Sequence, residues 1–141
     1  MRPLPLLVLL LTTAAWGADP DPSTLYSLTT DGSSTVMKAG QPGTFVLSIR
    51  PASGAHISAD APLKLVLSGS GGVQPGKSQL GRADAKSIAQ GAGPADTRFE
   101  VPLSASAKGK GGVEAKLTFF VCTDTLCSRQ QKTVSLPVTV N

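Results

Sequence analysis

Two cysteines are the residues of this chain whose type and spacing could do chemistry. Cys122 and Cys127 are the only cysteines in 141 residues, and the four residues 123–126 separate them. If that segment is the turn of a β-hairpin, the two positions face each other across the strand pair. Their Cα atoms would then lie within the roughly 4.4–6.8 Å that a disulfide needs. The pair could serve as a structural bridge or exchange with other disulfides.

A disulfide that closes so short a loop adds little to global stability. Chain entropy gives about 2 kcal/mol for a loop of six residues, against nearly 5 kcal/mol for one of about 100. The spacing therefore favours shaping of the turn, or redox exchange, over bulk stabilisation. Exchange also needs an accessible sulfur and a stabilised thiolate. The candidate cations are Arg129, Lys132 and His56, and they are opposed by Asp124 inside the turn. Both alternatives stay open.

His56 is the single histidine of the chain. One histidine cannot form a histidine-rich zinc site, and its spacing from the cysteines does not indicate a mixed site. We interpret it as a loop or packing residue. The carboxylates are few and dispersed, so no acid–base pair is indicated. We expect no metal, no cofactor and no enzymatic activity, except at most thiol–disulfide exchange.

Residues 71–78 (GGVQPGKS) match the phosphate-binding pattern GxxxxGKS. That motif requires a helix after the loop within a βαβ unit. Here Gly81 interrupts any helix, and the chain shows no βαβ alternation. We interpret the segment as a glycine-rich surface loop and expect no nucleotide. The basic residues are scattered without interleaved aromatics, so we also expect no nucleic acid partner.

Short segments with period-two alternation must position these residues. The strand-like segments are 25–30, 34–38, 44–50, 63–68, 97–105, 113–122 and 134–140. The glycine-rich stretch 69–96 is expected to hold short edge strands near Val73 and Leu80, with a helical turn across 83–89. No segment shows sustained helical spacing. The pattern predicts an all-β fold, an immunoglobulin-like antiparallel β-sandwich of about seven to eight strands.

Three local features refine this prediction. Asp31-Gly32 favours a two-residue hairpin turn between the first two strands. The segment 44–50 reads as a half-buried strand, with Phe45 on the buried face and Val46 and Ser48 on the other. Pro102 suggests an edge strand or a bulge.

The first residues predict the cellular location of the protein. Arg2, an apolar run and Ala15-Trp16-Gly17 have the form of a signal peptide spanning 1–17. A polar, flexible lead-in would follow at 18–24, and then a single β-sandwich domain at 25–141. The composition suggests a bacterial source. We therefore expect a periplasmic or secreted protein, not inserted in the membrane after cleavage, whose cysteines meet an oxidising environment.

The chain resembles the N-terminal periplasmic domain of the bacterial membrane thiol:disulfide reductase DsbD, and its stand-alone, disulfide-corrector-like relatives. The resemblance covers roughly residues 63–140. The matching residues are Gly54-Ala55-His56-Ile57 followed by Pro62 and Leu63-Lys64-Leu65, then Arg98-Phe99-Glu100-Val101-Pro102 and Leu117-Thr118-Phe119-Phe120-Val121-Cys122, with Cys127 and a closing Val-x-Leu-Pro-Val run. The resemblance implies an immunoglobulin-like sandwich. It also implies that Cys122 and Cys127 relay electrons, with a membrane reductase or thioredoxin-like proteins as partners. The alternative is a non-enzymatic cell-envelope binding or structural module, whose disulfide only shapes the last hairpin.

Overall fold

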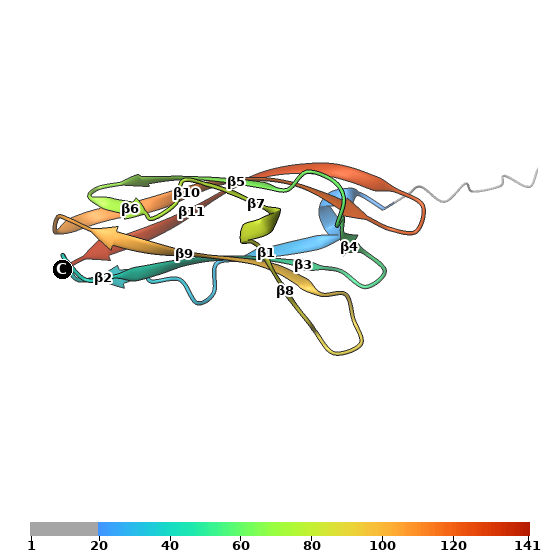
Figure 1. Ribbon diagram of the computed structural model, residues 1–141, viewed down its shortest axis with the longest axis horizontal. Helices are drawn as coiled ribbons and strands as arrows, with labels where there is room; N and C mark the ends of the chain where they lie inside the picture. The colour runs from blue at the N-terminus through green and yellow to red at the C-terminus, as the bar shows by residue number, and fades with distance from the viewer. Residues whose placement is uncertain (1–19) are drawn as a thin grey trace, which may run out of the picture.

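The computed structural model describes residues 20–141, which form two β-sheets packed face to face into an elongated sandwich (Figure 1). This range contains no α-helix. It has two turns of 3-10 helix, η1 (Pro22–Thr24) and η2 (Arg82–Asp84). η1 falls within the segment predicted as a lead-in, and the side chain of Asp21 caps it. The signal peptide predicted for 1–17 lies outside the described residues.

The first sheet has five strands in which every pairing is antiparallel. Its order is β1 (Tyr26–Thr29), β3 (Gly43–Pro51), β9 (Asp96–Ala105) and β6 (Val73–Pro75), and β8 (Lys86–Ile88) also pairs with β9. β9 is therefore an inner strand. On one side, β9 pairs with β8 at residues 96–98 and with β6 at residues 103–105. Pro102 falls between these two pairings, so its missing N–H removes no hydrogen bond from either ladder.

The second sheet has six strands and carries both cysteines. Its order is β2 (Val36–Met37), β11 (Cys127–Val140), β10 (Gly109–Cys122), β5 (Lys64–Ser70) and β7 (Gln79–Gly81), and β4 (His56–Ile57) also pairs with β10. The β2–β11 pairing is parallel and the others are antiparallel. The chain thus folds as the predicted all-β, immunoglobulin-like sandwich. The strand count exceeds the prediction because several strands have only two or three residues, too few to show alternation.

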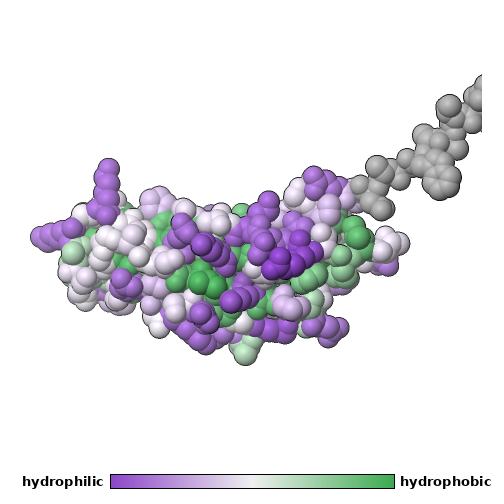
Figure 2. Space-filling view, turned by 90° about the horizontal axis from the view of Figure 1, so that it is seen from above, coloured by the Kyte–Doolittle hydropathy of each residue, from purple (hydrophilic) through white to green (hydrophobic). Residues whose placement is uncertain are grey.

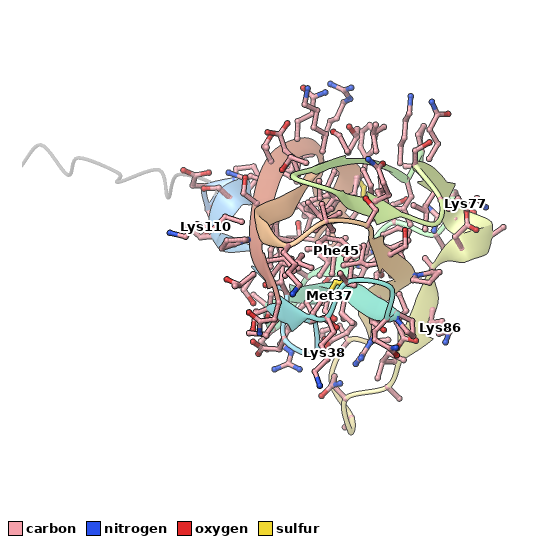
Figure 3. The ribbon with its side chains drawn as sticks, turned by 90° about the vertical axis from the view of Figure 1, so that its left-hand side faces the viewer. Met37, Lys38, Phe45, Lys77, Lys86 and Lys110 are labelled. Carbon is pink, nitrogen blue, oxygen red and sulfur yellow. A yellow bond between two sulfur atoms is a disulfide. The ribbon has the colours of Figure 1, made fainter. Side chains whose placement is uncertain are left out.

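The core lies between the two sheets and is mostly aliphatic. Phe45, Phe99 and Phe119 are fully buried there. In the end-on view Met37 and Phe45 lie between the layers, whereas the labelled lysines lie at the periphery (Figure 3). One face of the molecule is mostly hydrophilic, with scattered hydrophobic areas (Figure 2). Inward alternation of Leu, Val and Phe is therefore what holds the layers together.

The hairpin predicted around Asp31-Gly32 is wrong. β1 pairs with β3 in the first sheet, whereas β2 pairs with β11 in the second. The turn, with Gly32 at φ 91°, instead passes the chain from one sheet to the other. Ser34 N–H donates to Thr44 C=O at 2.8 Å on the way. The turn at Asp31-Gly32 is present as predicted, but pairing with strands distant in the sequence decides which sheet each flanking strand joins.

The prediction of a half-buried β3 is also wrong, because the strand is buried on both faces. Val46 and Ser48 are only 2% and 8% exposed. The turn at Gly32 folds back over this outer face, so that a Cβ at Gly32 would lie 3.5 Å from Val46. The loop between β1 and β2 thus covers a face that alternation alone assigned to solvent.

The glycine-rich stretch contains the two short strands expected near Val73 and Leu80, namely β6 and β7. The helical turn predicted across 83–89 is correct only at its start. η2 ends at Asp84, and residues 86–88 form β8. Lys86 and Ile88 pair with β9, so strand pairing overrides the local helical tendency there.

Candidate functional site

The β10–β11 hairpin positions both cysteines. Its antiparallel ladder runs unbroken from Gly109↔Val140 to Cys122↔Cys127. Thr123 closes the turn: its N–H donates to Leu126 C=O at 2.7 Å, and its hydroxyl accepts from the Leu126 N–H at 3.2 Å. The predicted terminal hairpin with a cysteine at each end of its turn is therefore present.

Cys122 and Cys127 form a disulfide with Cα atoms 4.0 Å apart. This is slightly closer than the predicted spacing, because the two residues are direct register partners. Directly opposed antiparallel residues without mutual hydrogen bonds lie about 4.5 Å apart. The disulfide thus joins the last residue pair of the β10–β11 ladder, in which strand pairing already places the two residues opposite each other.

The two cysteines differ in exposure. Cys122 is only 2% exposed, because β10 has β11 on one side and β4 on the other. Cys127 is exposed, since β11 has no neighbour beyond it at this point within residues 20–141. An incoming group can therefore approach the bridge from the Cys127 side.

His56 lies beside the disulfide. It is the register partner of Cys122 on β4, so its side chain lies on the same face of the sheet as the two cysteines. The order across three strands is His56, Cys122, Cys127, and His56 is exposed. The interpretation of His56 as a loop or packing residue is therefore incomplete, because it lies in a strand in register with Cys122. Sequence patterns missed this neighbour because β4 is only two residues long.

The other candidate charges are divided between the two faces of the sheet. Arg129 shares the face of Cys127, two residues along β11, whereas Lys132 lies on the opposite face. Hydrogen bonds from the backbone and side chain of Ser23 lower the pKa of Asp21, and the nearby charge of Lys132 adds a smaller contribution. Asp124 is exposed in the turn. Of the three predicted cations, the structure thus brings His56 and Arg129 to the disulfide's face.

An aromatic contact supports the hairpin near its tip from the core side. The rings of Tyr26 and Phe119 meet edge to face, with centroids 4.8 Å apart. The Tyr26 hydroxyl donates to Gln130 Oε1 at 3.1 Å. Burial raises the pKa of Tyr26, and the charge of Asp21 adds to this. β1 is thereby held against both strands of the hairpin.

The phosphate-loop match has a structural explanation. Residues 71–78 are followed by strand β7 and not by a helix. A Cβ at Gly71 would lie 2.3 Å from the Lys110 carbonyl oxygen, so close packing requires glycine there. The motif's lysine, Lys77, is paired with Asp84 at 2.6 Å. The glycines serve strand packing.

A polar hollow of about 170 Å³ lies on the outer face of the first sheet. Its deepest charge is Asp96, whose carboxylate accepts from Arg50 Nε at 3.1 Å and Nη2 at 2.9 Å. That hydrogen bonding raises the pKa of Arg50. The pair joins β3 to β9, and we interpret it as a structural link.

Three further observations concern the residues that the structure describes. Within residues 20–141 no group of three or more histidine, cysteine and acidic side chains is arranged to hold a metal ion. No helix in that same range is long and apolar enough to cross a membrane. Three carboxylates are engaged in ion pairs: Asp84 with Lys77, Asp96 with Arg50, and Glu100 with Lys86.

Comparison with known proteins gives little guidance. No family model matches the chain, and no curated protein matches it. A solved structure similar to it is AggA, the major subunit of aggregative adherence fimbriae type I from Escherichia coli. The two share 13% identity with a TM-score of 0.42, over 82% of this chain and 94% of that one. We draw no functional conclusion from this similarity, and the resemblance to the reductase domain stays a prediction.

Proposed function

We propose that this chain is a small, exported, non-enzymatic β-sandwich, a binding or structural module of the cell envelope. Its Cys122–Cys127 disulfide would fix the tip of the last hairpin. One observation carries the proposal: the bridge joins two residues that the ladder already places 4.0 Å apart. A bond at that position restrains a turn, and turns at the ends of a sandwich are common binding surfaces.

The burial of Cys122 supports this reading over a redox one. If a partner thiolate attacked Cys127, the leaving sulfur would be that of Cys122, which is 2% exposed. Burial disfavours a thiolate, and a poor leaving group slows exchange. Export is supported by the signal-like segment 1–17 together with a formed disulfide, which persists in oxidising compartments.

The second candidate function is a dithiol/disulfide relay. It is favoured by the exposed Cys127 and by His56 opposite Cys122, since a protonated imidazole there would stabilise the departing thiolate. In that reaction a thioredoxin-like or membrane reductase dithiol would form a mixed disulfide with Cys127. The partner's second thiol would then attack the partner's own sulfur in that bond, so that the partner's disulfide forms and Cys122 and Cys127 are both left as thiols.

Partner capture with cysteine variants tests the module. The Cys122→Ser, Cys127→Ser double variant should keep its circular dichroism spectrum and change which envelope proteins are retained from an extract. The relevant control is the wild-type chain purified with its bridge intact. Unchanged non-covalent retention in the variant would contradict a role of the bridge in binding.

Trapping of mixed disulfides tests the relay. Cys122→Ser leaves Cys127 as an exposed thiol, and Cys127→Ser leaves the buried thiol as the matched control. A relay predicts that only the first variant captures thioredoxin-like proteins covalently. The module predicts that neither variant captures them.

A further inference from the structure

The outer edge of β11 has no paired strand along most of its length, although η1 lies near the strand on the side where Asp21 is close to Lys132. β10 pairs with one side of the whole strand, whereas β2 pairs with the other side only at Thr139 and Val140. Over residues 20–141, no strand and no backbone hydrogen bond engages the outer side of 127–137. An open edge presents unpaired N–H and C=O groups to any chain that can pair with it.

The ladder shows which groups point outward. Thr139 donates its N–H to Thr35 C=O at 2.9 Å on the outer side. Outward and inward residues alternate in an antiparallel strand, so the odd-numbered residues back to 127 also face outward. Pro137 occupies one of these positions, where its missing N–H removes no bond to β10. The stretch 129–135 is left with outward N–H and C=O groups at every second residue; only the Arg129 carbonyl is engaged, by the neighbouring Gln130 side chain at 3.1 Å.

This open stretch is basic. Arg129 and Lys132 are both exposed, and β11 contains no acidic residue. Across the ladder Lys116 lies opposite Thr133. Two acids lie nearby. Glu114 is opposite Ser135 at one end of the stretch, and Asp21 lies close to Lys132 within it, with its carboxylate accepting from the Ser23 N–H. Arg129 is therefore the cation with no acid described beside it.

This inference rests on the proposed binding module. We propose that the edge of β11 from Arg129 to Ser135 accepts an extended acidic peptide segment of a partner protein as an added strand. The backbone groups would supply the hydrogen bonds, and Arg129 and Lys132 the preference for carboxylates. A second copy of this chain fits less well. Two β11 edges would bring the same two cations from each copy to one seam, without a carboxylate from either strand.

Binding of a synthetic peptide tests this edge. The probe is a labelled peptide of about seven residues in which pairs of adjacent Glu are separated by Val. Its carboxylates then project from both faces of the added strand, because Arg129 and Lys132 lie on opposite faces of the sheet. Anisotropy is measured against the disulfide-bonded chain. Gln131→Pro removes one outward N–H without touching the β10 ladder, and Gln131→Ala is its matched control. We expect the proline variant to bind about tenfold more weakly than the alanine variant, as the loss of one strand hydrogen bond implies.

Two further binding measurements do not depend on whether the proline variant folds. A probe N-methylated at every second residue should bind when the methyl groups face away from β11 and fail when they face it. A lysine-for-glutamate probe should fail, as should the Arg129→Glu, Lys132→Glu variant. Lys108→Glu, Lys110→Glu at the far end of the hairpin should bind normally.

Equal binding by the proline and alanine variants would overturn the proposal. So would a dimer of the free chain, seen by light scattering, that Gln131→Pro abolishes, since a second copy would then occupy the edge. If the peptide fails but retention of envelope proteins still depends on the disulfide, this inference falls and the module stands. If peptide binding persists while the cysteine variants trap thioredoxin-like proteins, the edge inference stands without the module.

Discussion

Cys122 and Cys127 occupy unequal environments within one bridge. Cys122 lies on an inner strand, flanked by β4 and β11, and Cys127 lies on the outer one. The position of each strand in the sheet therefore decides that one cysteine is buried and the other exposed. Sequence spacing predicted the bond between them but not this asymmetry, because β4 is too short to be recognised.

The stability contribution of the bridge follows from its span. Replacing both cysteines by serine should lower the free energy of unfolding by about 2 kcal/mol, as chain entropy gives for a six-residue loop. Urea denaturation of the oxidised wild type and the double variant measures this. A loss near 5 kcal/mol would show that the bridge supports the whole fold and not only its tip.

Tyr26 provides a second measurement at single-residue scale. Its pKa is raised by burial, so the group keeps its proton more strongly in the folded state than in the unfolded one. Its stabilising contribution is complete below the unfolded value of about 10 and is lost as pH rises through the folded value.

The ultraviolet absorbance of phenolate reports Tyr26 directly, because it is the only tyrosine. We expect a titration midpoint above 10 in the folded chain and a lower one in urea. Tyr26→Phe should cost about 1 kcal/mol, the contribution of its hydrogen bond to Gln130. Identical midpoints in both states would contradict this assignment.

Among the elements, β5 crosses its neighbours closely enough to require glycine. A Cβ at Gly69 would lie 1.9 Å from the Val73 carbonyl oxygen, whereas one at Gly81 would lie 3.8 Å from its nearest atom, the Leu63 carbonyl oxygen. Gly69→Ala should destabilise the chain by about 1–3 kcal/mol through overpacking. Gly81→Ala, the matched control, should stay within about 0.5 kcal/mol.

Thermal melts of the two glycine variants would test this account of the glycine-rich segment. Equal melting temperatures would contradict the packing role assigned to Gly69. The same crowding explains why residues 71–78 could imitate a phosphate loop: glycines placed for close strand approach fall by chance at the spacing of the motif.

The strands also differ in how well the sequence predicts them. The alternation predicted β5, β9, β10 and the second half of β11, because each of these buries one face regularly. It did not predict the first half of β11, residues 127–133, because none of these residues is buried. It failed at β3, whose outer face is covered by the turn at Gly32. It failed again at Asp31-Gly32, where the turn was correct but the strands on either side join different sheets. Both failures come from contacts distant in sequence.

At the scale of the whole molecule, the composition and the sheet order of residues 20–141 agree on a β-sandwich, while the cellular location stays a prediction. Expression of the full-length chain in a bacterium should yield a periplasmic protein whose mature N-terminus is Ala18. Fractionation and intact-mass analysis would measure this. A cytoplasmic protein that keeps Arg2 would contradict the predicted signal peptide and, with it, the oxidising environment.

We infer that the Cys122–Cys127 bridge is a structural restraint on the hairpin tip. The most direct measurement is a redox titration of the purified chain in dithiol buffers. Because the ladder holds both residues in register and Cys122 is buried, we predict a midpoint below about −300 mV, as for structural disulfides. A midpoint between about −120 and −270 mV, the range of exchanging disulfides, would contradict the claim and favour the relay.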